Sequence, residues 1–183
     1  MTTNPYAPPT AVVDDVPTPL AASAEPPFFA VSLPKLVVLS LCTLGLYELF
    51  WFYRNWQRIN VREQYKLNPV LRTFFSVIFC YACFSRIREH GSRLGVQPPL
   101  AAGALAAGWI VTTILWKLPD PFWLISLLAV SFMLPVQAYA NRVNAATVPD
   151  HDPNRRFTGW NWFAVVVGGG LLVLAILGSF VPE

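Results

Sequence analysis

Residues 36–66 read LVVLSLCTLGLYELFWFYRNWQRINVREQYK, and this stretch decides the predicted fold. Its first half is apolar enough to lie in lipid, whereas its second half carries a basic residue at every fourth position. An aromatic cluster separates the halves, as is typical of the boundary between hydrocarbon and headgroups. We therefore expect a membrane helix that continues into the cytoplasm as an amphipathic helix with one basic ridge. The basic ridge consists of Arg54, Arg58, Arg62 and Lys66.

The composition indicates a membrane protein rather than a soluble domain. Apolar residues make up 55% of the 183 residues and charged residues only 13%, whereas soluble domains carry about 25% charged residues. The three cysteines, Cys42, Cys80 and Cys83, all lie in apolar runs, which excludes a secreted disulfide framework. We expect an all-α, polytopic chain in the inner (plasma) membrane of a bacterium.

The run TLGLYELFWFYRNW, residues 43–56, resembles the signature of a bacterial membrane family described only as domain of unknown function 4234. That signature has a Thr, a Gly and a Tyr at the end of an apolar helix, then a Trp-aromatic-Tyr cluster and a basic helix. The resemblance covers about residues 30–90. It implies a class and a location but no catalytic residues. Glu48 departs from the pattern, because a small or apolar residue is expected there.

The chain divides into a tail and a membrane domain. Residues 1–34 are proline-rich and acidic, and we expect them to be disordered. Residues 35–183 form the helical membrane domain, with transmembrane helices expected over about 33–53, 100–116, 122–140 and 160–181. Charge asymmetry places the tail, the turn at Lys117 and the C-terminus outside, and the basic loops in the cytoplasm.

The apolar run 70–84 is ambiguous. A helix between its flanking arginines spans about 20 Å, whereas the hydrocarbon is about 30 Å thick. Basic loops flank it on both sides, so a crossing would place one of them outside. We predict four transmembrane helices plus one short in-plane or re-entrant helix at 70–84, with five transmembrane helices as the alternative.

Glu48 is the one acidic residue inside a predicted span, and an ionisable group there is a functional candidate. It either pairs structurally with an arginine of the basic ridge or of the neighbouring loop, or it couples a proton or cargo. The basic side chains either contact anionic lipid headgroups or only determine topology. The lipid-contacting candidates are Arg54, Arg58, Arg62, Lys66, Arg72 and Arg86. The candidates for close helix packing, within the chain or in a homo-oligomer, are Gly45, Gly103, Gly168, Gly169 and Gly170.

Cys80 and Cys83 share a helical face, but a zinc site needs two further ligands, and an apolar setting disfavours a redox thiolate. We expect no metal, cofactor, catalytic residue or nucleic-acid partner, and therefore no enzyme. The first hypothesis is a non-enzymatic scaffold or interaction subunit with a basic cytoplasmic surface, in contact with anionic lipids and a protein partner. The second is a small transporter or lipid-handling protein that uses Glu48 and nearby arginines.

Overall fold

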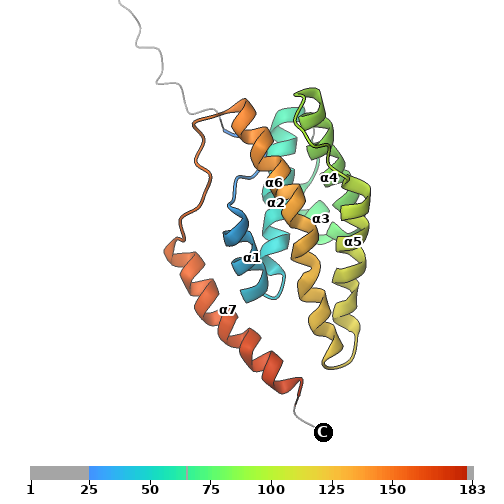
Figure 1. Cartoon of the computed structure of the whole chain (residues 1–183), viewed down its shortest axis with the longest axis vertical. Helices are drawn as coiled ribbons and strands as arrows, with labels where there is room; N and C mark the ends of the chain where they lie inside the picture. Colours follow the sequence, from blue (N-terminus) through green and yellow to red (C-terminus); the bar gives the residue numbers. More distant parts are fainter. Residues whose placement is uncertain (1–24, 65, 181–183) are drawn as a thin grey trace, which may run out of the picture.

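The computed structural model describes residues 25–64 and 66–180, and these residues form a helical bundle without strands (Figure 1). The predicted all-α class is confirmed. Residues 1–24 of the predicted tail lie outside the described residues. The helices are α1 (Leu33–Cys42), α2 (Leu46–Glu63), α3 (Pro69–Phe74), α4 (Ser76–Arg93), α5 (Ala102–Ile114), the 3₁₀ helices η1 (Leu115–Lys117) and η2 (Phe122–Leu128), α6 (Ala129–Thr147) and α7 (Gly159–Gly178).

The stretch that opened the sequence analysis is two helices, because the chain reverses between α1 and α2 (Figure 1). Leu44 and Gly45 both have positive φ, 51° and 87°. Thr43 joins the two helices: its hydroxyl donates to the Leu39 carbonyl (2.7 Å) and accepts from the Tyr47 N–H (2.9 Å). The Gly45 N–H also returns to the Ser40 carbonyl at 2.8 Å. The Thr-Leu-Gly-Leu-Tyr motif is therefore a hairpin turn.

The prediction of four transmembrane helices, or five, is wrong. Only two helical stretches of the described residues are long and apolar enough to cross a membrane, Phe122–Thr147 and Gly159–Gly178. They correspond to the spans predicted at 122–140 and 160–181. The span predicted at 33–53 contains the α1–α2 reversal, and α1 is only ten residues long. The span predicted at 100–116 falls in a shorter apolar helix, Ala102–Lys117.

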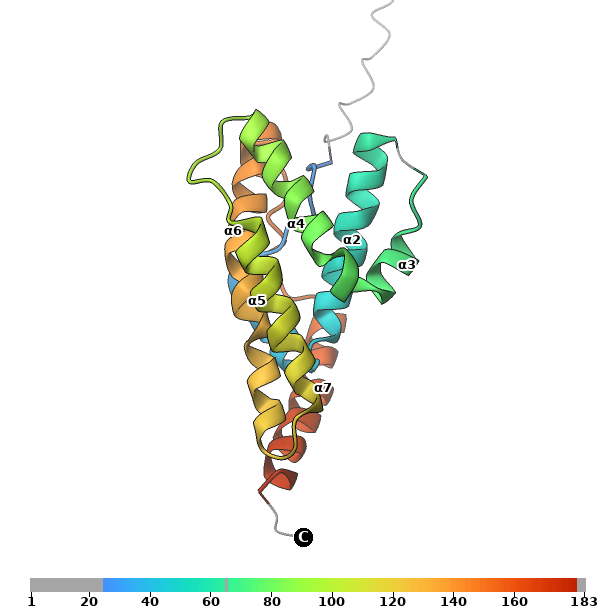
Figure 2. The same cartoon turned by 90° about the vertical axis from the view of Figure 1, so that its right-hand side faces the viewer.

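The ambiguous run 70–84 contains a break. α3 ends at Phe74, and α4 begins at Ser76 after a non-helical Phe75. In Figure 2, α3 lies beside α2, and α4 rises away from it. Large apolar side chains of α3 and the first turns of α4 are exposed, and they are Val70, Leu71, Phe74, Phe75, Val77, Ile78 and Tyr81.

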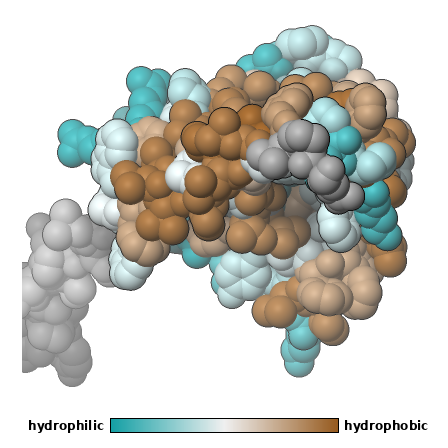
Figure 3. Space-filling view, turned by 90° about the horizontal axis from the view of Figure 1, so that it is seen from below, coloured by the Kyte–Doolittle hydropathy of each residue, from teal (hydrophilic) through white to brown (hydrophobic). Residues whose placement is uncertain are grey.

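The molecule has a charged end and an apolar end. The C-terminal ends of α2, α4 and α6 meet at the upper end of Figure 1, whereas the turn after α5 and the end of α7 lie at the lower end. Neither α5, η2 nor α7 contains a charged residue. Apolar side chains predominate in the view from below (Figure 3). We call these the basic end and the apolar end.

An extended segment, residues 25–32, runs into the core from the basic end, and we call it the strap. Phe28 and Val31 are fully buried, although both belong to the tail predicted at 1–34. The strap lies against α2 and α6, where Trp51, Trp56 and Tyr139 are also buried. The core is therefore assembled from the bundle and from the chain that precedes it.

Candidate functional site

The basic ridge on α2 faces the strap. Arg58 forms a salt bridge with Glu25 at 2.5 Å. The Arg62 guanidinium lies 4.6 Å from the centroid of the Phe28 ring, within the range of a cation–π contact. Arg54 lies 5.8 Å from the Phe29 ring in the same way. Three of the four ridge residues therefore have partners inside the protein.

The remaining lipid-contacting candidates are separated. Lys66 is exposed and lies beyond α2, which ends at Glu63, so it does not continue the ridge on the helix. Arg72, on α3, lies 4.5 Å from the Trp56 ring and 4.9 Å from the Phe79 ring. Arg86, on α4, forms a salt bridge with Glu63. The structure brings Arg62 and Arg86 together and leaves Lys66 and Arg72 outside that group.

Arg62 and Arg86 line a cleft of about 650 Å³ at the basic end, which we call the basic cleft. Glu63 accepts from Arg62 at 2.9 Å and also binds Arg86. Burial, with the nearby charges of Arg86 and Arg93, lowers the pKa of Arg62 to about 10. The lining residues are Arg62, Glu63, Ala82, Ser85, Arg86, Glu89, His90 and Arg93.

Two polar atoms of the basic cleft have no hydrogen-bond partner within residues 25–64 and 66–180, Ser85 Oγ and His90 Nε2. Burial lowers the pKa of His90, and Arg62 and Arg93 lower it further. The surroundings of the imidazole therefore favour its neutral form. The basic cleft thus combines a neutral imidazole, a hydroxyl and three arginines with two carboxylates. The N–H and O–H groups of the cleft can donate hydrogen bonds to an anionic oxygen.

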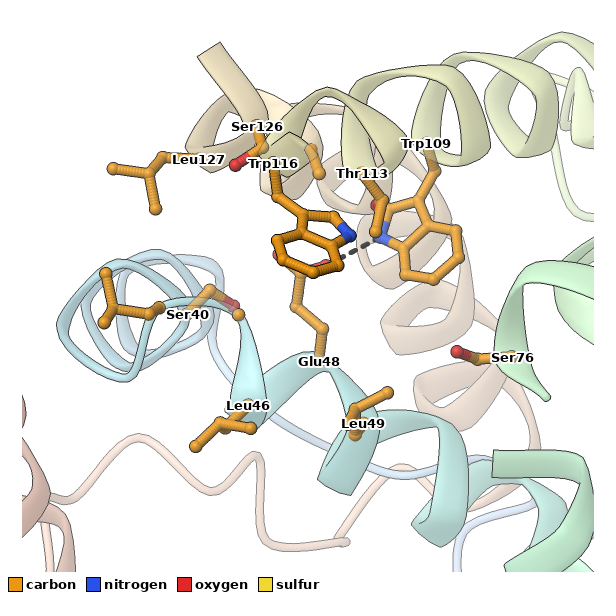
Figure 4. Close-up of a pocket in the computed structure, with 13 residues that line it drawn as sticks. Ser40, Leu46, Glu48, Leu49, Ser76, Trp109, Thr113, Trp116, Ser126 and Leu127 are labelled. Carbon is orange, nitrogen blue, oxygen red and sulfur yellow. Dashed lines mark hydrogen bonds between the residues drawn. The ribbon is translucent and has the colours of Figure 1, made fainter. Parts of the chain in front are cut away.

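Glu48 lies in a second cavity, of about 200 Å³, at the start of α2 (Figure 4). Its side chain is almost fully buried, with 5% of its surface exposed. The Trp109 indole N–H on α5 donates to Glu48 Oε2 at 2.6 Å. No salt bridge reaches Glu48 from the part of the chain that the structure describes. The expected arginine partner is replaced by an indole.

Hydroxyl groups and indole rings surround this Glu48 cavity. In Figure 4, Ser40 projects from α1 on one side, and Thr113, Trp109 and Trp116 project from the α5–η1 segment on the other. Ser40 Oγ and Thr113 Oγ1 are buried and have no hydrogen-bond partner among the described residues. Ser40 is 2% exposed. The cavity therefore presents one carboxylate and two hydroxyls with unused acceptor capacity.

The cysteines do not form a reactive site. Cys80 and Cys83 are free and buried on α4. Burial raises the pKa of both thiols, which disfavours the nucleophilic and metal-binding thiolate. Among the described residues, no cluster of three or more His, Cys, Asp or Glu side chains could hold a metal ion.

The predicted packing glycines differ in their surroundings. Gly168, at the middle of α7, lies so close to α1 that a Cβ atom would overlap the Cys42 carbonyl oxygen. A Cβ on Gly169 would contact Cys42 Sγ at 3.6 Å, and one on Gly103 would contact Tyr81 at 3.8 Å. Gly170 has nothing within 4 Å in the described residues. Gly45 provides the left-handed turn rather than a packing surface.

Sequence analysis missed the amide side chains that hold the strap, which we call the amide clamp. Asn144 accepts from the Phe28 N–H and donates to the Phe28 carbonyl, both at 3.0 Å. Asn55 accepts from the Phe29 N–H at 3.2 Å. Gln137 donates to the Phe29 carbonyl at 3.1 Å, and Asn141 donates to the Val31 carbonyl at 2.9 Å.

The amide clamp does have a signal in the sequence. Gln137, Asn141 and Asn144 recur at helical spacing in the second half of α6, so they share one face of the helix. Amides on a buried face need backbone or side-chain partners. An extended segment without secondary structure supplies such partners, because its own N–H and C=O groups are unpaired.

No family model, curated protein or solved structure matches this chain. The resemblance of residues 43–56 to the domain of unknown function 4234 stays a prediction.

Proposed function

We propose that this chain is an integral protein of the bacterial inner membrane and acts as a non-enzymatic scaffold or interaction subunit. One observation carries the membrane placement. α7 has apolar residues on all its faces, and not one of its 20 residues is buried by the protein. A helix that is apolar on all sides is unfavourable when it is exposed to water. Lipid is the solvent that suits it.

The position of the indole side chains supports this placement. Twenty residues of α-helix are about 30 Å long, which matches the hydrocarbon thickness. Trp160 and Trp162 stand exposed at the start of α7. At its other end, Trp123 donates to Ser179 at 2.9 Å, close to the exposed Trp116. Indoles at both ends of the apolar belt are typical of membrane interfaces.

The α1–α2 hairpin enters this belt without crossing it. Lys35, at the start of α1, donates to the Arg156 carbonyl at 2.7 Å, just before α7 begins. The end of α1 meets Gly168, the tenth residue of α7. The hairpin turn thus lies near the middle of the belt, and both of its outer ends return to the basic end. The strap then lies on the same side of the membrane as the basic ridge.

Charge supports a cytoplasmic location for the basic end. Its loops and helix ends hold nearly all the basic residues of the described chain, whereas the apolar end holds Lys117 with Asp120. Lys and Arg near span ends favour the cytoplasm. In this orientation the shorter apolar helix Ala102–Lys117 also runs from the cytoplasmic side to the outer side. The basic cleft lies beside the anionic headgroups of the inner leaflet, where each basic residue contributes about 1 kcal/mol. The scaffold role rests on this cytoplasmic surface and on the exposed apolar helices beside it.

Cell fractionation with cysteine labelling tests the placement. Cys42, Cys80 and Cys83 are replaced by Ala, and single cysteines are introduced at Ser92 and at Ser179. We expect the protein to stay with membranes in alkaline carbonate. An impermeant thiol reagent added to intact cells should label position 179 and spare position 92 until the cells are permeabilised. Extraction by carbonate would contradict the membrane placement, and the opposite labelling would contradict the orientation.

Lipid retention tests the basic surface. The purified chain in nanodiscs that contain anionic and zwitterionic lipids should enrich the anionic lipid. Arg93→Gln should reduce this enrichment, whereas Lys117→Gln at the apolar end is the matched control and should not. Equal effects of the two substitutions would show that the basic cleft has no special affinity for anionic headgroups.

A further inference from the structure

We propose that the Glu48 cavity is a binding site for a primary alkylammonium group. Its cavity of about 200 Å³ is larger than a bare metal ion and has room for an amine with a short alkyl chain. This inference does not depend on the membrane placement, because every lining residue comes from this chain, from the α1–α2 hairpin, α4, the α5–η2 segment and the start of α6.

The acceptors of the cavity match the donors of such a group. A primary ammonium has three N–H donors and no acceptor. The cavity offers Glu48, whose one hydrogen bond from the described residues comes from Trp109, and the buried hydroxyls of Ser40 and Thr113. These three groups can accept one N–H each. A buried carboxylate without a cation is costly, and a bound ammonium would remove that cost.

The rest of the lining suits an organic cation. The indole rings of Trp109 and Trp116 lie beside Glu48 in Figure 4, and indole is the aromatic ring that attracts cations best. Leu44, Leu46 and Leu49 line the cavity and are also exposed at its edge, so they can contact alkyl carbons. A hard metal ion would find a single carboxylate, with neutral hydroxyl groups as its other side-chain oxygen ligands.

Two sources could supply this group, a free alkylamine and the ethanolamine headgroup of a lipid. Calorimetry with the full chain in detergent, with n-butylammonium as probe, tests the first source. Native mass spectrometry of the chain from nanodiscs with ethanolamine-headgroup or glycerol-headgroup lipid tests the second. Tetramethylammonium is the control cation, because it has similar size and no N–H donor. Sodium chloride controls for a simple ion site.

We expect saturable binding from at least one source, and at least tenfold weaker binding in Glu48→Gln. Gln keeps an oxygen that can accept from Trp109, so the substitution should preserve the fold. Glu89→Gln, which removes an acid at the basic end, is the matched control and should bind as the parent does. If Glu48→Gln fails to fold, Thr113→Val and Ser40→Ala decide, and each should weaken binding several-fold without a change in melting temperature.

Three results would overturn the proposal. They are the absence of saturable binding from both sources, equal affinity in the parent and the cavity variants, and binding of tetramethylammonium or sodium as tight as that of n-butylammonium. None of these results bears on carbonate extraction or on labelling of position 179, so the proposed function would survive them. Conversely, a chain found outside the membrane could still bind the probe in this cavity.

Discussion

α7 and the span predicted at 33–53 are both apolar, and both are predicted to cross the membrane, yet only α7 is a single continuous helix. α7 contains three consecutive glycines and stays helical from Gly159 to Gly178. The α1–α2 region contains one glycine and reverses at it. The difference lies in the hydrogen bonds at the glycine. Thr43, beside Gly45, bonds to the last turn of α1 and to the first turn of α2. Glycine in α7 makes no turn, and at Gly168 its small size allows close packing against α1. Apolar length alone does not separate a span from a hairpin.

The largest expected effect concerns the side of the membrane on which the strap lies. In the cysteine-free background, single cysteines at Glu25 and Gln64 should both be protected from an impermeant reagent in intact cells. The hairpin returns the chain to its starting side, so the two positions should behave alike. Labelling at position 25 with protection at position 64 would mean that α1–α2 crosses, which would remove the contrast with α7. Permeabilised cells provide the control, because both positions should then react.

We expect the amide clamp to contribute more to the free energy of unfolding than any polar group of α7 does. Asn144→Ala leaves the buried N–H and C=O of Phe28 without partners, and each unsatisfied group costs about 1–3 kcal/mol. We expect a loss of about 2–4 kcal/mol in unfolding free energy in mild detergent.

Asn161→Ala is the matched control on α7. It removes one of the two hydrogen bonds of the exposed capping box, from the Thr158 N–H to Asn161 Oδ1, which should cost less than about 1 kcal/mol. Equal losses for Asn144→Ala and Asn161→Ala would show that the strap is not held by its amide partners.

The sequence pattern predicted α7 and much of the η2–α6 span, because a long apolar run with Trp at its ends favours one continuous helix. The sequence pattern did not predict the hairpin or the strap. Periodicity in residues 36–66 does not reveal whether Thr43 and Gly45 end a helix or merely interrupt it. The strap has no periodicity at all, since extended chain that pairs with side chains leaves no pattern of its own.

The hydrogen-bond partner of Glu48 could not be predicted from the sequence pattern either. The sequence singles out Glu48 as an acid in an apolar run, but the partner expected for it came from the nearest arginines along the chain. Trp109 is 61 positions away and reaches Glu48 only because α5 packs beside the hairpin. Pairings of this kind depend on the tertiary fold, and a single sequence does not encode them locally.

Substitutions at two nearby glycines of α7 test the packing of α7 against α1. Gly168→Ala places a methyl group against the Cys42 backbone carbonyl, which cannot move without bending α1. We expect a loss of about 1–3 kcal/mol, as is typical of overpacking. Gly170→Ala meets nothing within 4 Å among the described residues and should gain up to about 1 kcal/mol from helix propensity. Denaturation of both variants in detergent measures the difference, and equal effects would mean that α7 does not pack on α1.

The smallest expected effect is a pH dependence of the strap. The His90 ring packs edge-on against Phe28, with centroids 5.6 Å apart. Burial, Arg62 and Arg93 all lower the pKa of His90. The unfolded chain therefore takes up the proton at a higher pH than the folded chain does. The contribution of neutral His90 to stability is complete above about pH 6.5, its unperturbed pKa, and is lost as the pH drops below it.

We expect the melting temperature of the parent in detergent, relative to that of His90→Asn, to fall between pH 7.5 and pH 5.5. His151→Asn is the matched control, because His151 lies in the loop before α7 and contacts the Val148 carbonyl rather than the strap. The effect should be small, no more than about 2 °C, since His90 is partly exposed and water and the nearby Glu63 and Glu89 can accommodate its charge. A pH dependence that persists unchanged in His90→Asn would place its origin elsewhere and leave the strap insensitive to protonation. A dependence lost in His90→Asn alone would distinguish the strap region from α7, which has no titratable group between Gly159 and Gly178.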